Sequence, residues 1–302
     1  MLLRTSKPTL TPFGLHHGET LRFARRHGDV WEMTLLDTSA EVIARDYARY
    51  GNGDTGHGTG DISAYAFSCA VRVNGQEYTL RREVGTQASF YAPWEIDGLH
   101  LWFDAAACAF SHAGGFMVEK DWRGNLLCAP SHAARFVVHE ADLPICPEPL
   151  HPWYPNTTGR LDIHDCYHGE DCWMGPYGGI AAHCGLDINM PAGTVLTAPI
   201  ACDDHYLVYS TAAGFNNNRW RGIRRWADGS EWWLQTAHQI AMLAPERAPL
   251  PAGAPYATAA GVFVGDFAHT HFNFRVLEQG GDYMLDPWIL FWAIFRQQRV
   301  GF

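Results

Sequence analysis

The first half of the chain alternates apolar and polar residues in the way that predicts β-strands with one buried face. Strands are expected at Trp31–Leu36, Phe67–Val73, Glu77–Leu80 and Leu99–Phe103. Asn74 and Gly75 separate the second and third of these strands, and this dipeptide favours the tight turn of a β-hairpin. Ser39–Tyr50 fits either a helix or a bent strand, because its periodicity does not distinguish the two. The first half is therefore predicted to be β-rich and sandwich-like.

A proline-rich stretch separates this half from the rest of the chain. Five prolines fall between Pro144 and Pro155, a composition that favours an extended connector. We therefore expect one domain over residues 1–148 and a second over residues 149–302. In the second, short apolar runs alternate with turns rich in glycine and asparagine, which predicts antiparallel β-structure. These runs are Thr194–Pro199, Tyr206–Ser210, Trp232–Thr236, Gly261–Val264 and His271–Val276.

One helix is predicted close to the C-terminal end. Asp286 suits the N-cap position and Pro287 the first helical position. The following residues, Trp288–Gln298, are apolar on nearly every side, so the helix is expected to pack as a buried lid on the sheet. The fold class is thus mainly β, with a single C-terminal helix.

Composition narrows the classes of function. The net charge of −10 over 302 residues makes a broad basic surface for nucleic acid unexpected. No run approaches the roughly 18 consecutive apolar residues of a membrane helix, and no signal peptide is visible in Met1–Leu15. Eight cysteines occur without a C-x-x-C pair, which disfavours a cysteine-rich zinc site. Cys166 and Cys172 are close enough in sequence for a disulfide, and most of the others are expected to be buried free thiols.

Two short segments carry metal-binding chemistry. His183 and Asp187 lie four residues apart, with Gly185 between them expected to let the backbone turn so that both grip one ion. His269 and His271 lie two apart on a predicted strand, so their side chains point to the same face. Imidazole and carboxylate groups suit zinc, and three protein ligands leave a fourth position for water. Either segment alone is weak evidence, because sixteen histidines make such spacings common by chance.

Together with their surroundings, these segments resemble the lysostaphin-type, or LytM-type, zinc metallopeptidases. The signature of that family is H-x-G-x-D-I, then P-x-G-T-x-V-x-A, a histidine on a central strand, and finally H-x-H-F. The corresponding elements here are His183–Ile188, Pro191–Ala198, His238 and His269–Val276. The resemblance covers about residues 150–302 and implies a lysostaphin-like antiparallel β-sheet metallopeptidase domain, the duplicated hybrid motif.

The resemblance also implies a role for each site residue. One zinc ion would be held by His183, Asp187 and His271. His238 and His269 would stay off the metal and face the substrate, one as general base and one as donor to the oxyanion. Which of the two is the base stays open.

Other features bear on mechanism and substrate. An H-E-x-x-H motif is absent, because Leu143 stands where a second histidine would follow His139 and Glu140. Gln239 follows His238 where the family more usually has leucine. This departure bears on the choice of substrate more than on metal binding. Asn216–Trp226 is interpreted either as one wall of a substrate groove or as an exposed hairpin, and His16 and His17 are expected to be solvated.

The function that the resemblance implies is hydrolysis of peptide bonds in peptidoglycan stem peptides or cross-bridges, in the cell envelope, the periplasm or outside the cell. Two alternatives stay open. One is a zinc hydrolase of another peptide or amide, and the other is a non-catalytic scaffold or activator of cell-wall hydrolases. The partner expected is peptidoglycan or another peptide substrate, with neither nucleic acid nor a membrane span. Nothing in the sequence assigns a role to residues 1–148.

Overall fold

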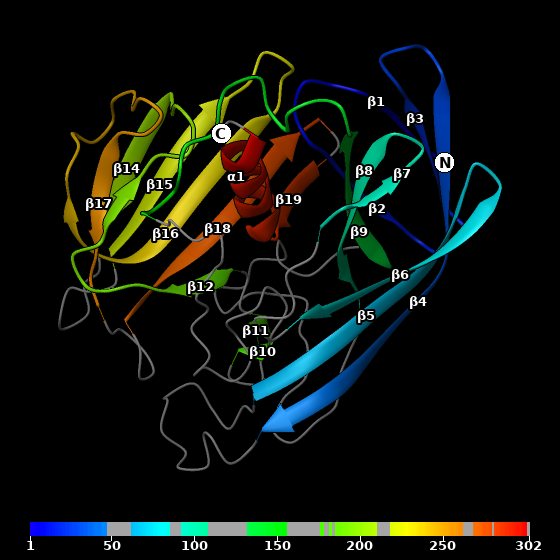
Figure 1. The fold of residues 1–302 in the computed structure, drawn as a ribbon, viewed down its shortest axis with the longest axis horizontal. Helices are drawn as coiled ribbons and strands as arrows, with labels where there is room; N and C mark the ends of the chain where they lie inside the picture. Colours follow the sequence, from blue (N-terminus) through cyan, green and yellow to red (C-terminus); the bar gives the residue numbers. More distant parts are fainter. Residues whose placement is uncertain are drawn as a thin grey trace.

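The computed structural model describes residues 1–46, 62–84, 92–107, 132–155, 176–177, 181–182, 185–209, 218–261, 268–279 and 281–300. Within these residues the fold is mainly β with one helix, α1 (Trp288–Val300), near the C-terminal end, as predicted (Figure 1). Over the same residues, no helical segment has the length and hydropathy that crossing a membrane requires.

A five-stranded sheet forms the outer layer of the first half. Its strands, in spatial order, are β1 (Leu2–Thr5), β3 (Thr20–Ala24), β4 (Val30–Asp46), β5 (Ile62–Val73) and β6 (Gln76–Val84). The predicted hairpin joins β5 to β6 through Asn74 and Gly75, with φ angles of 46° and 90°. Positive φ at both positions is what a two-residue hairpin turn requires. The ambiguous stretch from Ser39 is a strand as far as Asp46, and residues 47–50 lie outside the described part.

A four-stranded sheet packs on the first one. Its order is β2 (Thr11–Leu15), β9 (Ala134–Glu140), β8 (Leu99–Ala106) and β7 (Trp94–Ile96). One apolar cluster joins residues of both sheets, including Phe13, Trp31, Phe67, Phe103 and Phe136. The sandwich-like first half is therefore confirmed.

The second half is built on an antiparallel sheet. The main order is β12 (Leu186–Asn189), β18 (His269–Glu278), β16 (Glu231–Met242), β15 (Asn218–Arg225) and β14 (Asp204–Val208). β19 (Gly281–Leu285) pairs with β18, while β17 (Pro255–Ala259) pairs with β16 and with β13 (Val195–Thr197). A short separate pair joins β10 (Pro176–Tyr177) and β11 (Ala181–Ala182). Four of the five predicted runs coincide with strands, and the fifth, Gly261–Val264, falls mostly outside the described residues.

Helix α1 packs against both halves of the molecule (Figure 1). On one side, Phe291 meets Phe272 of β18 with ring centroids 5.3 Å apart. On the other side, Trp292 meets Trp102 and His100 of β8, with centroids 5.4 and 5.3 Å away. The helix is thus not a lid on one sheet. Because it is apolar on nearly every side, it can be buried from two directions.

The proline-rich connector is irregular, as predicted, but it is not a solvated spacer. Ile145, Cys146 and Trp153 are buried in the apolar cluster that also contains α1. Trp153 donates its indole N–H to the hydroxyl of Tyr256 on β17, at 3.0 Å. This cluster also includes Leu10, Trp102 and Val137 of the first half, so it extends across the boundary between the two halves. The domain division near residue 148 stays a prediction.

A cluster of buried charges also joins the two halves. Arg82 of β6 pairs with the carboxylate of Asp286, and Arg135 of β9 pairs with Asp104 of β8. Asp104 in turn accepts the backbone N–H of Asp286 at 2.9 Å. The other carboxylate oxygen of Asp286 accepts the N–H of Trp288 at 2.8 Å, which confirms the predicted N-cap. Burial raises the pKa of Asp286, and the Arg82 guanidinium opposes this rise.

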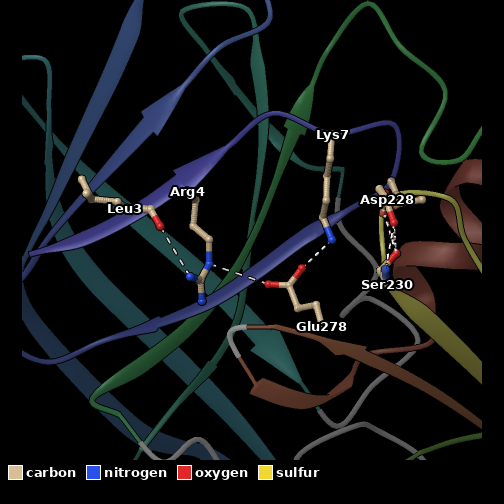
Figure 2. A network of polar contacts seen from close by, with 7 residues as sticks. Leu3, Arg4, Lys7, Asp228, Ser230 and Glu278 are labelled. Atoms are coloured by element: carbon tan, nitrogen blue, oxygen red, sulfur yellow. Dashed lines mark hydrogen bonds and ion pairs between the residues drawn. The ribbon is translucent and has the colours of Figure 1, made fainter.

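The N-terminal segment is fastened to the second half as well. Figure 2 shows the carboxylate of Glu278, at the end of β18, between Lys7 and Arg4. Thr9 donates its hydroxyl to Asp228, which also binds Ser230 in the β15–β16 turn. These polar contacts connect the first strand of the chain to the sheet that carries the predicted site.

Three of the cysteines lie in the described residues, and all three are buried free thiols. Burial raises the pKa of Cys146 and of Cys202 to about 12, which keeps both thiols protonated and unreactive. Cys69 is shifted in the same direction for the same reason. Cys166 and Cys172 lie outside the described residues, so their disulfide stays a prediction.

Candidate metal centre

Two predicted ligands meet across a pair of neighbouring strands. Asp187 of β12 is the direct antiparallel partner of His271 of β18. Side chains of directly opposed residues lie on the same face of a sheet, so the carboxylate and the imidazole are brought together. Asp187 Oδ1 and His271 Nδ1 lie 2.7 Å apart, although 84 residues separate them in sequence.

His269 contacts the same carboxylate. Its Nε2 lies 3.6 Å from Asp187 Oδ2, and its side chain is only 2% exposed. The two histidines of the H-x-H motif therefore face one carboxylate, each near a different oxygen. The prediction that they point to the same side of the strand is confirmed.

Gly185 serves this arrangement in a way that the sequence did not indicate. Its φ does not lie in the left-handed region that only glycine adopts easily. A Cβ atom at this position would instead lie 2.2 Å from Cε1 and 2.3 Å from Nε2 of His271. The glycine is needed because the imidazole occupies the space of a side chain.

His238 reaches the site through a bulge in β16. Arg219 pairs with Ala237 and Asn218 with Gln239, so the register with β15 passes over His238, which is the extra residue of the bulge. Its φ of 64° is left-handed, which is uncommon for a residue other than glycine. Ala237 is the direct partner of His271, so in a regular strand the next side chain would point away from the site. The bulge turns His238 towards the other histidines.

The side chain of Gln239 stabilises this bulge. It is fully buried, accepts the backbone N–H of Trp220 at 3.0 Å and donates to the carbonyl of Ala237 at 3.1 Å. A bulge interrupts the ladder and leaves backbone groups that need other partners. In the sequence, Gln239 stands out only as a departure from the family pattern. The signal that could have identified its role was a polar residue at a position where the family has an apolar one.

Four of the five predicted site residues thus come together. Ligand atoms of Asp187, His238 and His269 all lie within 4.8 Å of one another. The ring centroid of His238 lies 4.8 Å from that of His269 and 6.3 Å from that of His271. His183 lies outside the described residues, so its place in the site stays a prediction.

The donor set fits a zinc ion. Tetrahedral zinc with bonds of about 2.0–2.2 Å places its ligand atoms about 3.3 Å apart. The Asp187–His271 separation of 2.7 Å and the Asp187–His269 separation of 3.6 Å lie on either side of this value. Two sets of ligands remain, and His183, which would complete one of them, lies outside the described residues. Asp187 belongs to both sets, with His271 and His183 in one and with His238 and His269 in the other.

The expectation that Asn216–Trp226 is exposed, as a groove wall or as a hairpin, is wrong for its two tryptophans. Residues 218–225 form β15, in the body of the sheet. Trp220 is fully buried and stacks on Tyr256, with ring centroids 3.7 Å apart, and Trp226 is buried as well. Neither tryptophan forms an exposed wall for a substrate. The reason is that β15 lies between β14 and β16, where its inward side chains join the core.

No protein-family model matches the chain, and no curated protein matches it in sequence. Among solved structures, it is similar to the solution structure of lysostaphin, with 20% identity over 38% of this chain and 44% of that chain and a TM-score of 0.30. It is also similar to the catalytic domain of lysostaphin from Staphylococcus simulans, with 20% identity, coverage of 38% and 80%, and a TM-score of 0.26. A zinc-containing peptidase from Vibrio cholerae matches with 9% identity, coverage of 94% and 84%, and a TM-score of 0.28.

The matched region spans less than half of the full lysostaphin structure. TM-scores of this size do not indicate a function, so the function is inferred from the residues of the site alone.

Proposed function

We propose that this chain is a zinc-dependent peptidase that cleaves peptide bonds in peptidoglycan stem peptides or cross-bridges. The observation that carries the proposal is the convergence on Asp187 of both histidines of the H-x-H motif, with His238 turned to the same face by a left-handed bulge. A strained residue and a shared buried carboxylate have no evident structural purpose here, whereas both are typical of functional sites.

His183, Asp187 and His271 would hold the ion. A zinc ion bound there supplies Lewis acidity, which polarises a carbonyl and makes water acidic enough to attack near neutral pH. Asp187 and His271 are rigidly placed, because each lies on a strand of the same ladder and Gly185 leaves room for the imidazole.

His238 and His269 would handle protons. Imidazole exchanges protons near neutral pH, so one ring can accept the proton of the attacking water and the other can donate to the oxyanion. The two rings lie edge to face, with an interplanar angle of 76°. They therefore present nitrogen atoms in different directions, as two separate tasks require.

The substrate rests on the motif resemblance. That resemblance favours peptide bonds of the bacterial cell wall as the substrate, and the cell envelope, the periplasm or the outside of the cell as the location. A zinc hydrolase of another peptide or amide uses the same residues. A non-catalytic scaffold is less well supported, because it needs neither the strained His238 nor the buried Asp187. Residues 149–302 would form the catalytic domain, and residues 1–148 a β domain fastened to it.

The test is metal analysis of the purified chain together with digestion of isolated peptidoglycan and identification of the released ends. We expect one equivalent of zinc at this centre and new amino termini from the peptide bridges. His271→Ala should lose both the zinc and the hydrolysis. His269→Ala should keep the zinc and lose turnover by about 10²–10⁴-fold, the usual contribution of a general acid or base.

The two substitutions also distinguish the two ligand sets. If His269→Ala loses the zinc while His271→Ala retains it, the ligands are Asp187, His238 and His269 instead. Hydrolysis by a metal-free chain would overturn the proposal altogether. If the chain binds zinc and cleaves other peptides but not peptidoglycan, the proposed zinc-dependent hydrolysis is supported and peptidoglycan is excluded as its substrate.

A further inference from the structure

A second group of metal-binding side chains lies on the four-stranded sheet of the first half. His16 follows β2, Glu19 precedes β3, and His132 precedes β9. One ligand atom from each of the three lies within 4.8 Å of the other two. None of these residues belongs to the candidate site at Asp187. His16 is exposed as expected, but it is packed against another histidine.

The strand pairing brings the two histidines together. β2 and β9 are antiparallel, and Leu15 pairs with Ala134 at the end of their ladder. His16 and His132 lie just beyond this pair, and their ring centroids are 4.6 Å apart with an interplanar angle of 34°. Both rings are thus at the open end of the sheet, where an ion from solvent can reach them.

Gly14 makes room for one of the rings. A Cβ atom on Gly14 would lie 2.7 Å from Nδ1 and 2.8 Å from Cγ of His132. The imidazole of His132 therefore lies directly over the backbone of β2. This is the same device that Gly185 provides for His271.

The carboxylate is held by its own turn. Glu19 Oε2 accepts the backbone N–H of His16 at 2.8 Å, and the N–H of Glu19 donates to the carbonyl of His16 at 3.0 Å. The turn is also held against β4. Leu35 of that strand accepts the N–H of Gly18 and donates its own N–H to the carbonyl of Glu19. The position of Glu19 next to the histidines is therefore set by the main chain.

We propose that His16, Glu19 and His132 form a second metal site, which binds one divalent zinc-type ion and clamps the β2–β3 turn to the start of β9. Two imidazoles and one carboxylate are ligands for zinc and similar first-row ions, whereas magnesium and calcium prefer oxygen ligands alone. Ligand atoms on tetrahedral zinc are about 3.3 Å apart, and those of the three side chains lie within 4.8 Å of one another, so they have to approach by at most about 1.5 Å. Partly exposed side chains can make this adjustment by rotation. Water completes the coordination.

The test is a zinc titration of the full chain, without an affinity tag, followed by calorimetry in metal-free buffer. It is carried out in the Asp187→Ala background, because Asp187 belongs to both ligand sets of the first site and its loss removes that site's contribution. We expect one equivalent of zinc in this background, bound at micromolar concentrations. Adding His16→Ala or His132→Ala should abolish that binding, and adding Glu19→Gln should weaken it. His17→Ala is the matched control, because His17 is equally exposed but contacts Thr38.

Zinc should also raise the thermal unfolding midpoint of the Asp187→Ala chain, since a ligand that binds only the native state stabilises it. This rise should be absent after His132→Ala and present after His17→Ala. The proposal is overturned if His16→Ala and His132→Ala bind zinc as the background does, or if binding needs millimolar zinc. These results do not depend on hydrolysis, so they are independent of the function proposed for the first site.

Discussion

At the scale of single residues, His238 has a backbone conformation that is unfavourable for most side chains. His238 has a φ of 64°, a conformation that costs about 1–2 kcal/mol for most side chains. Asparagine tolerates this region much better than β-branched residues do. The histidine is kept there because its imidazole has to reach the face that His269 and His271 share.

Substituting His238 by asparagine and by valine should separate function from strain. Both variants lack the imidazole, so turnover should fall by about 10²–10⁴-fold in each. The valine variant should in addition be less stable than the asparagine variant by about 1–2 kcal/mol, because a β-branched side chain at positive φ is strained. Urea unfolding measures the difference. Equal stabilities would show that residue 238 is not left-handed.

At the scale of single elements, irregularities in the strands position the site more than the regular ladders do. β16 carries His238 on a bulge, and Gly185, just before β12, stands where a side chain would displace His271. Gln239 replaces the backbone partners that the bulge removes. Strand, bulge and side chain therefore act as one unit.

Gln239→Leu should destabilise the protein and impair the site together. The leucine would leave the N–H of Trp220 and the carbonyl of Ala237 without their side-chain partner, at a cost of about 1–3 kcal/mol in the free energy of unfolding. Turnover should fall because His238 is less well held, while the zinc content stays the same. Gln235→Leu is the matched control on the same strand and should have little effect on either. Unchanged turnover in Gln239→Leu would remove its positioning role.

At the scale of the whole molecule, the two halves are held by a shared core and by buried charges. Helix α1 contributes to both, because its aromatic side chains contact β8 and β18 and its N-cap, Asp286, pairs with Arg82. Removing one partner of a buried ion pair lowers the free energy of unfolding much more than removing one partner of a surface pair does.

Arg82→Met should therefore lower the free energy of unfolding by about 3–5 kcal/mol, because it leaves the Asp286 carboxylate buried without its cation. Arg81→Met is the control one residue away. Arg81 pairs with Glu41 and Glu83 at the surface, so its loss should lower the free energy of unfolding far less than the loss of Arg82 does. Denaturant unfolding of both variants provides the comparison. Similar losses for both would show that Arg82 is not buried between the halves.

The interface should also respond to acid through His100. Burial, together with the charges of Arg296 and His139, lowers the pKa of His100 to about 4. The folded-state pKa lies below the unfolded value of about 6.5, so the folded protein favours the neutral ring. Stability from this group is thus full above about pH 6.5 and is lost as the pH falls towards 4.

The loss should be on the order of 1–2 kcal/mol, because solvent screening reduces the effect of the lowered pKa for a ring that is only partly shielded. Denaturant unfolding at a series of pH values should show this loss in the wild type. His100→Asn should remove it, so that the stability of the variant falls less steeply over the same range. Parallel profiles for the two chains would exclude His100 as the acid-sensitive group.

Much of the fold was predictable from local pattern. The hairpin at Asn74 and Gly75, the N-cap at Asp286 and most strands of the second half depend on residues close together in sequence. The relation of His269 to His271 was predictable for the same reason, because alternation along one strand sets it. By contrast, the helix was expected on one sheet and packs against two. An apolar surface does not specify which neighbour covers it.

The sequence by itself determined the candidate residues of the first site and the strand that carries His269 and His271, because motif spacing and strand alternation act over a few residues. Only the tertiary structure decided that Asp187 meets His271 across 84 residues, that His238 is turned by a bulge, and that His16 lies against His132. These contacts depend on strand register. Register is set by the packing of whole sheets, so it cannot be predicted from a local sequence pattern.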